Sequence, residues 1–441
     1  MSADEIFRSL FFWALNAGGV VFLVLITMTT LMMWYVTIIG FKGYGKAKRD
    51  YEIIPPKARF LILVAAHNEE AVIASAVEDL RKITYDKDKF DIYVVNDNST
   101  DGTEAECKRI GVNYINTGEK KFPREGVGKP GGLQYALRAL GFEKIKEKYD
   151  LVMILDADNH VDPFILSEVN SQWYGKDKPE AIQCYLDSKN FDNSISLGYA
   201  SAYVIGNRFF QLAKYRLGLP NSIGGTGFSV SAEYLINSGG FNYKSLTEDL
   251  EMSIEIVSNH GRVLWNHFAR VYDEKPEDMK ISLGQRTRWM QGHWFVAFSY
   301  GKDLLVKLFK ERKLKYLDQL LVLFSASKSI VIAMMFLGLF GSGLILFILG
   351  DIFTFSDVLR RVYNSIFGVS LLGFILMLYY LLVQGTYAFK ADSRVKYSLK
   401  TILSMYLYGF TFIYCHIKGF LKRKDQGTWV KTIHTKTTKS E

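Results

Sequence analysis

Cysteine is scarce in this sequence: its 441 residues include only three, Cys107, Cys184 and Cys415. They lie far apart and form no CxxC pair, which argues against a disulfide framework and against a cysteine-ligated metal. We therefore expect all three thiols to be reduced. The chain also shows no internal repeat and no low-complexity linker, which argues against a repeat protein or a largely disordered chain.

Charged residues are absent from the first long apolar run, residues 11–41, which is long enough to cross a bilayer. The run is too long for a cleaved signal peptide, and no basic segment precedes it. Basic residues follow it instead (Lys42, Lys46, Lys48 and Arg49). By the positive-inside rule, the N-terminus lies outside and the next domain lies in the cytosol. The net charge of +9 gathers beyond apolar runs, which suits anionic lipid better than nucleic acid.

The middle of the chain, from about residue 51 to residue 315, has an α/β pattern. Short apolar runs predict buried strands, and the stretches between them predict helices (strands 60–66, 90–95 and 151–155; helices 71–82 and 131–140). This alternation predicts a parallel sheet covered by helices on both faces. Polar clusters follow each strand (67–70, 96–101 and 156–158). Ligands bind beyond the carboxyl ends of such strands, so the clusters indicate one site.

Three further apolar runs follow (320–349, with its spanning part at 330–349; 366–389; and 398–420). Residues 301–315 mix basic and apolar residues, which fits an interfacial amphipathic helix or a solvated surface helix. We expect four parts: an N-terminal transmembrane helix, a cytosolic catalytic domain, interfacial and transmembrane helices, and a cytosolic tail (1–50, 51–300, 301–420 and 421–441). A cytosolic tail requires either that 398–420 lies along the interface, which we favour, or that 320–349 hides an extra pass.

Asp156 and Asp158 follow an apolar strand and are separated by one residue. Two such carboxylates can converge on one Mg²⁺ or Mn²⁺ ion, which prefers oxygen ligands and bridges to phosphate oxygens. Taken alone, the triplet also fits an ordinary surface turn. Asp97 can accept a hydrogen bond from a uracil ring, and Lys129 can face a diphosphate, although both also fit plain turns.

Thr247, Glu248 and Asp249 open a predicted helix, in which Thr247 fits the N-cap and the acids fit the first turn. Alternatively, Asp249 is a general base that removes a proton from an attacking sugar hydroxyl. Further along, Gln285, Arg288 and Trp289 can share one helical face. Arg288 can then bind a diphosphate and Trp289 can stack on a sugar ring, although an interfacial anchor also explains this pair.

Together these residues match the order and approximate spacing of the signature "D, DxD, TED, Q(Q/R)xRW". Between about residues 55 and 300 the sequence resembles the processive, membrane-bound family 2 glycosyltransferases. These include the cellulose, hyaluronan and poly-N-acetylglucosamine synthases. The uridine motif departs slightly, because Asn96 precedes Asp97 where many relatives have a second aspartate.

The resemblance implies a GT-A fold, a UDP-sugar donor and Mg²⁺ or Mn²⁺. It implies that Ala66, His67, Glu69 and Asp97 hold uridine and that Lys129, Asp156 and Arg288 contact the diphosphate. Asp158, with Asp156, would hold the metal. The catalytic pair would be Asp249, the base, and Glu248. The acceptor would lie against Gly225, Thr226, Gln285 and Trp289. Trp429 and Lys431 resemble part of a C-terminal gating segment that closes over UDP.

The expected activity is therefore inverting polymerisation of a nucleotide sugar at the plasma membrane, with polymer export. We favour UDP-glucose and a β-glucan that is cellulose-like or of mixed 1,3 and 1,4 linkage. A poly-N-acetylglucosamine or hyaluronan product from UDP-N-acetylglucosamine is the alternative, and a lipid acceptor is a third. An alternative of another class is an inactive transport or scaffold protein, which would lack one or more of the acids Asp97, Asp156, Asp158 and Asp249. Expected partners are the UDP-sugar, the growing polysaccharide, the bilayer, and a second protomer or accessory subunit, with no nucleic acid.

Overall fold

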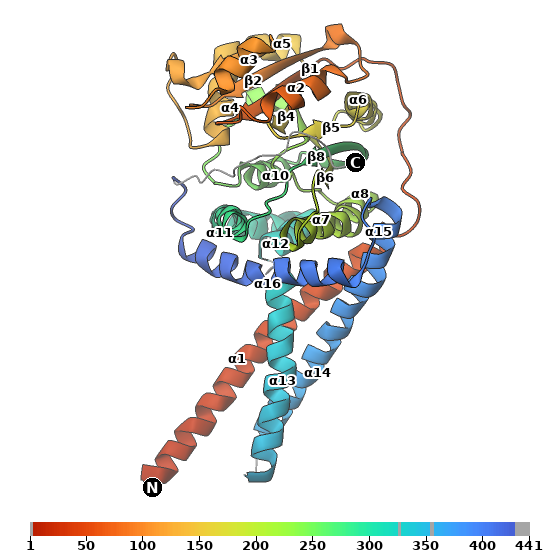
Figure 1. The fold of residues 1–441 in the computed structure, drawn as a ribbon. Helices are drawn as coiled ribbons and strands as arrows, with labels where there is room; N and C mark the ends of the chain where they lie inside the picture. The colour runs from red at the N-terminus through yellow and green to blue at the C-terminus, as the bar shows by residue number, and fades with distance from the viewer. Residues whose placement is uncertain (1–2, 325–327, 353–356, 428–441) are drawn as a thin grey trace.

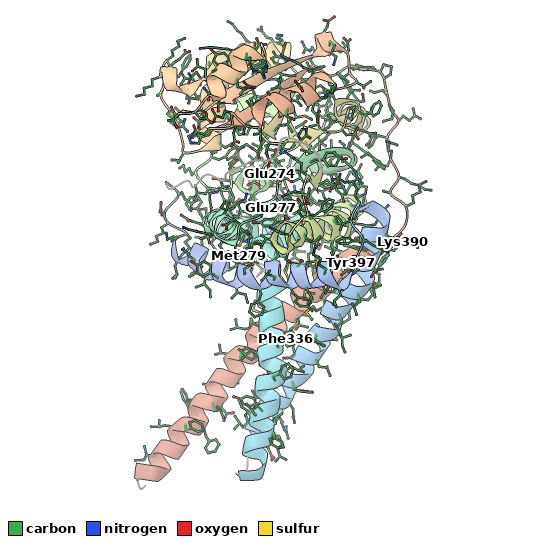
Figure 2. The ribbon with its side chains drawn as sticks, viewed as in Figure 1. Glu274, Glu277, Met279, Phe336, Lys390 and Tyr397 are labelled. Carbon is green, nitrogen blue, oxygen red and sulfur yellow. The ribbon has the colours of Figure 1, made fainter. Side chains whose placement is uncertain are left out.

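The computed structural model describes residues 3–324, 328–352 and 357–427. Three layers follow one another in Figure 1: an α/β domain, a layer of helices beneath it, and long helices that extend away from both. The long helices are α1 (Ala3–Gly40), α13 (Lys328–Ile352) and α14 (Asp357–Leu378). Figure 2 shows Glu274 and Glu277 between the domain and the helix layer, and Phe336 on α13 among the long helices.

The α/β domain is built on one eight-stranded sheet with the order β3-β2-β1-β4-β7-β6-β8-β5. Its strands are β1 (Phe60–Ala66), β2 (Phe90–Asn96), β3 (Asn113–Asn116), β4 (Leu151–Asp156), β5 (His160–Val161), β6 (Ala181–Ser188), β7 (Phe228–Ser231) and β8 (Val263–Asp273). The three strands expected from apolar runs are confirmed. These three strands pair in parallel, as expected, with β1 between β2 and β4. The complete sheet is mixed, because β7 pairs antiparallel with β4 and β6, and β5 pairs antiparallel with β8. Periodicity predicts strands but not their direction.

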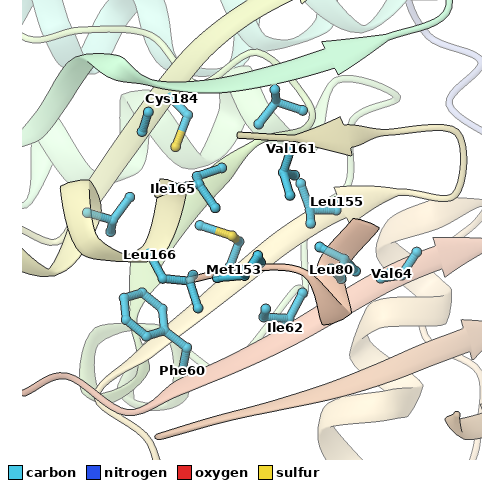
Figure 3. Close-up of a cluster of buried hydrophobic side chains, with 14 of the residues drawn as sticks. Phe60, Ile62, Val64, Leu80, Met153, Leu155, Val161, Ile165, Leu166 and Cys184 are labelled. Atoms are coloured by element: carbon cyan, nitrogen blue, oxygen red, sulfur yellow. The ribbon is translucent and has the colours of Figure 1, made fainter. Parts of the chain in front are cut away.

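Apolar side chains cover both faces of the sheet, which explains why its strands read as continuous apolar runs. Phe60, Ile62 and Val64 enter one buried cluster, shown in Figure 3, while Leu61 and Leu63 enter the cluster on the other face. The helices of the domain are α2 (Ile73–Arg81), α3 (Thr103–Arg109), α4 (Lys129–Leu140), α5 (Phe142–Lys148), α6 (Ile165–Gly175), α9 (Ala232–Asn237) and α10 (Glu248–Ser258). α2 and α4 confirm the expected helices.

The helix layer beneath the domain contains α7 (Ser194–Gly206), α11 (Met279–Glu311), α12 (Leu314–Phe324) and α16 (Leu399–Leu421). α7 continues through a π-helical turn (Asn207–Leu212) into α8 (Ala213–Arg216). The segment 301–315 is not a separate helix, because α11 continues through it to Glu311. Likewise, the run 320–349 is divided between α12 and α13. α16 begins at a capping box formed by Ser398 and Thr401. In Figure 1 it lies crosswise to the long helices.

Two helices among the described residues are long and apolar enough to cross a membrane, Ser9–Gly43 and Asp357–Asp392. The second joins α14, a π-helical turn (Tyr379–Gly385) and α15 (Thr386–Asp392) without a break. α13 carries a shorter apolar stretch, Met334–Phe347. These helices indicate membrane association. How many cross, and with which orientation, stays a prediction.

Candidate functional site

A cavity of about 740 Å³ lies between the sheet and the helix layer. Its walls come from the carboxyl ends of β1, β2, β4 and β8, from the loop before β7, and from α4, α10 and α11. Every predicted site residue in the described range lines it: Ala66, His67, Glu69, Asp97, Lys129, Asp156, Asp158, Gly225, Thr226, Glu248, Asp249, Gln285, Arg288 and Trp289. Trp429 and Lys431 lie outside the described residues.

The donor side of the cavity, as we call it, is formed by strand ends around Asp97. The side chain of Thr117 donates a hydrogen bond to Asp97 Oδ1 at 2.8 Å. Both terminal nitrogens of Arg124 bind the same carboxylate, one of them at 2.9 Å from Oδ2. His67 Nδ1 lies 2.6 Å from the carbonyl oxygen of Asp97. Arg124 and Thr117 were not predicted from the sequence, although Arg124 lies in the loop that leads to Lys129.

Lys129 is the first residue of α4, where Gly128, at a φ of +66°, turns the backbone into the helix. Its ammonium donates to the carboxylate of Asp156 and, at 2.7 Å, to the carbonyl of Gly225. The Asp156 side chain is still 40% exposed to the cavity. Lys129 therefore joins the aspartate pair to the loop that precedes β7.

Asp158 is buried, and its position is fixed on both sides of the carboxylate. Oδ2 accepts the backbone N–H of Glu274 at 2.8 Å, and Oδ1 accepts from the amide of Asn159 at 3.2 Å. No group of three or more metal-binding side chains was found among the described residues. Two hard carboxylates at the edge of a cavity fit Mg²⁺ or Mn²⁺, which bind one or two carboxylates together with substrate phosphates.

Asp273, at the end of β8, also lines the cavity, near Asp156 and Asp158, and was not predicted from the sequence. Burial raises its pKa to about 6; nearby Asp158 adds to the shift, and Lys275 opposes it. The Lys275 ammonium lies 2.7 Å from its carboxylate. The two adjacent acids Asp273 and Glu274 at a strand end could have indicated a site residue. Their place in the cavity, however, depends on the pairing of β6 with β8.

Glu248 and Asp249 occupy the first turn of α10. Burial raises the pKa of both carboxyls, whereas the positive charges of Lys129 and Arg288 oppose the shift. A Cβ atom built on Gly225 would lie 3.4 Å from Asp249 Oδ2, so this carboxylate faces the loop before β7. Thr247 stands at the N-cap position of α10, as the sequence predicts, but its side chain makes no capping hydrogen bond.

Helix α11 supplies the acceptor side of the cavity, which we define as Gln285 and Trp289. The Tyr199 hydroxyl donates to Gln285 Oε1 at 3.1 Å. The ring of Tyr199 meets Trp289 edge-on, with centroids 6.1 Å apart. Arg288 is half-buried on the same helix; desolvation lowers the pKa of its guanidinium, whereas the charges of Glu248, Asp249 and Asp156 oppose this shift.

The chain returns to this cavity after α16. Gln426 Oε1 accepts the backbone N–H of Leu246 at 2.8 Å, and Gly427 lines the cavity. The last described residue therefore lies beside the segment that carries Thr247, Glu248 and Asp249.

The fold and the cavity define a GT-A-type glycosyltransferase domain. Residues 55–292 match the family model described as "Glycosyltransferase like family 2", so the chain belongs to that family and uses a nucleotide sugar. A probable glycosyltransferase of Bacillus subtilis is 24% identical over 317 residues, which cover 70% of this chain and 73% of the relative. A β-monoglucosyldiacylglycerol synthase of Synechocystis is 27% identical, over 56% of this chain and 50% of its own length.

A poly-β-1,6-N-acetyl-D-glucosamine synthase of Staphylococcus aureus is 25% identical over 63% of each chain. Among solved structures, a mannosyltransferase from Pyrobaculum calidifontis in complex with GDP-Man and Mn²⁺ matches with a TM-score of 0.50 and 16% identity. That match covers 91% of this chain and 99% of the mannosyltransferase. At this identity the match supports the fold alone.

Proposed function

We propose that this protein is an inverting glycosyltransferase that extends a β-linked polysaccharide from a UDP-sugar, preferably UDP-glucose, at the cytosolic face of the plasma membrane. The observation that carries the proposal is that all the described motif residues line one cavity. The complete acid set (Asp97, Asp156, Asp158 and Asp249) argues against an inactive transport or scaffold protein.

The donor side suits a nucleoside diphosphate. Asp97 would accept the uracil N–H after exchanging part of its contact with Arg124, while Ala66, His67 and Glu69 line the same end of the cavity. Lys129 and Arg288 place two positive charges beside the expected diphosphate. Asp156 and Asp158 would hold Mg²⁺ or Mn²⁺, which supplies electrostatic stabilisation of the departing diphosphate.

Asp249 would accept the proton of the acceptor hydroxyl as that oxygen attacks the anomeric carbon. The bond from the anomeric carbon to the diphosphate oxygen breaks, and its electron pair leaves with UDP. One such displacement inverts the anomeric centre without a covalent enzyme intermediate. Burial raises the pKa of Asp249, which suits it to this proton transfer, and burial and the nearby charge of Asp249 raise the pKa of Glu248 beside it.

The acceptor sugar would stack on Trp289 and hydrogen-bond to Gln285, with Gly225 and Thr226 on the opposite wall. We propose that α1 and the helix 357–392 cross the membrane and that α16 lies along its cytosolic surface. A second protomer or an accessory subunit would then complete a polymer exit path. Trp429 and Lys431 would close over UDP, which the approach of Gly427 to the cavity favours.

A lipid acceptor is the second candidate. The first curated relatives include β-monoglucosyldiacylglycerol synthases, and the acceptor side of the cavity lies on the helix layer beside the long helices. The staphylococcal relative similarly keeps UDP-N-acetylglucosamine open as the donor, with a poly-N-acetylglucosamine or hyaluronan-type product.

Purified protein in lipid nanodiscs, given radiolabelled UDP-glucose or UDP-N-acetylglucosamine with and without diacylglycerol, tests the proposal. We expect a label that ethanol precipitates, that organic solvent does not extract, and that a linkage-specific β-glucanase releases. Solvent-soluble label that depends on diacylglycerol would establish the lipid acceptor instead. No transfer from either sugar would overturn both proposals.

A further inference from the structure

Arg286 lies inside the acceptor motif of α11 but does not line the catalytic cavity. It is only 1% exposed. Its Nη1 donates to the carbonyl oxygen of Tyr408 on α16 at 2.7 Å, and its Nε donates to the carbonyl of Ser282 at 3.3 Å. The guanidinium also lies 4.8 Å from the ring centroid of Tyr408 and 5.0 Å from that of Phe412. A buried cation thus binds α11 to α16.

Tyr199, on α7, connects this contact to the cavity. Its ring lies 4.5 Å from the ring of Tyr408 and 5.6 Å from the guanidinium of Arg286. Its hydroxyl donates to Gln285, and its ring touches the edge of Trp289. Gln285 and Trp289 therefore both contact Tyr199, which in turn packs against Tyr408 of α16.

Two glycines let α16 approach α7 and α11 closely. A Cβ atom on Gly198 would lie 2.6 Å from the carbonyl oxygen of Ser404, and one on Gly419 would lie 2.6 Å from Met290 Cβ. Both distances are shorter than non-bonded atoms allow. A shift of α16 would therefore displace α7 and α11 as well. The outward face of α16 is apolar and exposed, with Leu399, Leu403, Leu407, Phe410, Ile417 and Leu421.

We propose that Arg286 and Tyr199 are positioning residues that couple the docking of α16 to the acceptor side of the catalytic cavity. The inference deepens the proposed function and rests on it. A buried guanidinium needs its hydrogen bonds and aromatic contacts, so loss of α16 from its place would leave Arg286 exposed and Tyr199 without its neighbour. Gln285 and Trp289 would then lose the contacts with Tyr199 that hold them in position. Asp97, Lys129 and Asp156 would not, because they stand on strand ends and at the start of α4.

Two conservative substitutions test this, measured on full-length protein in nanodiscs with UDP-glucose and a β-1,4-linked glucose tetrasaccharide. Tyr199→Phe keeps the ring but removes the hydrogen bond to Gln285. Arg286→Lys keeps the charge but removes the forked geometry. We expect each to raise the KM for the tetrasaccharide by about fivefold or more, the effect of one hydrogen bond. UDP affinity, measured by calorimetry, should stay within about twofold.

Tyr414→Phe is the matched control, since Tyr414 lies on α16 but is 50% exposed; it should leave both constants unchanged. Variants that match the wild type in KM would overturn the coupling. So would variants that lose UDP affinity and tetrasaccharide affinity equally, because that pattern indicates general damage to the fold. A wild-type protein that transfers no glucose would overturn the proposed function, and this inference with it.

Discussion

The two sides of the catalytic cavity are held by different kinds of contact. On the donor side, acids at strand ends pair with basic residues of the segment that leads into α4, as in Asp97 with Arg124 and Asp156 with Lys129. On the acceptor side, Gln285 and Trp289 depend on packing among α7, α11 and α16. Sheet register fixes the first set, whereas helix docking fixes the second. Changes in the helix layer should therefore alter acceptor use and spare donor binding.

The largest effect should come from the metal, because it would stabilise the departing diphosphate in every transfer. Asp158→Ala removes a proposed ligand, and excess EDTA removes the ion, so each should abolish synthesis measured as label transferred from the UDP-sugar. The control is Asp88→Ala, which should have no effect because Asp88 is exposed and does not line the cavity. Full activity after exhaustive chelation would contradict the metal claim.

Asp249→Asn should separate chemistry from donor binding. Asparagine has nearly the same shape but cannot accept the proton, so turnover should fall by at least ~100-fold. UDP affinity, measured by calorimetry, should be retained. Glu255→Gln, on the same helix α10, serves as the control. Near wild-type elongation by the asparagine variant would show that another group is the base.

The pH dependence of turnover should also identify Asp249 as the base. Burial raises the pKa of Asp249, and its deprotonated form is the one that accepts a proton. As the pH falls, activity should be lost at a higher pH than the ordinary aspartate value of about 3.9 would give. Initial rates of UDP release between about pH 4.5 and 8 measure this limb. A limb at the ordinary value would argue that Asp249 is solvated or is not the base.

Gly132→Ala should have a smaller effect, which we expect on UDP binding alone. A Cβ atom on Gly132 would lie 3.0 Å from Asp97 Cγ, so Gly132→Ala should push that carboxylate and weaken UDP binding severalfold, about 1 kcal/mol. The tetrasaccharide KM should not change. Gly206→Ala, at a helical glycine with open space around its Cβ position, is the control. Equal effects on donor and acceptor would break the division between the two sides.

The topology can be tested without changing activity. A single cysteine introduced by Ser440→Cys, with Cys107, Cys184 and Cys415 replaced, should resist an impermeant thiol reagent in intact cells and react after lysis. This result is expected if the tail is cytosolic and α16 lies along the interface. Labelling in intact cells would contradict both the cytosolic tail and the gating role of Lys431.

The sequence determined the elements and the candidate residues, because these follow from local patterns. Continuous apolar runs identified β1, β2 and β4, and the polar clusters after them supplied Asp97, Asp156 and Asp158. The family signature supplied Asp249, Gln285, Arg288 and Trp289. The match of residues 55–292 to the family model confirmed the family.

Only the tertiary structure decided what depends on residues distant in sequence. Three features depend on how distant segments pack, which no local pattern encodes. They are the antiparallel direction of β7, the ion pair of Asp97 with Arg124, and the position of Asp273 near Asp156 and Asp158. The same holds for α16, whose apolar composition fitted a membrane span as well as an interfacial helix. Its docking on α7 and α11 gave Arg286 a partner, Tyr408, which is 122 residues away and which the place of Arg286 in the motif did not suggest.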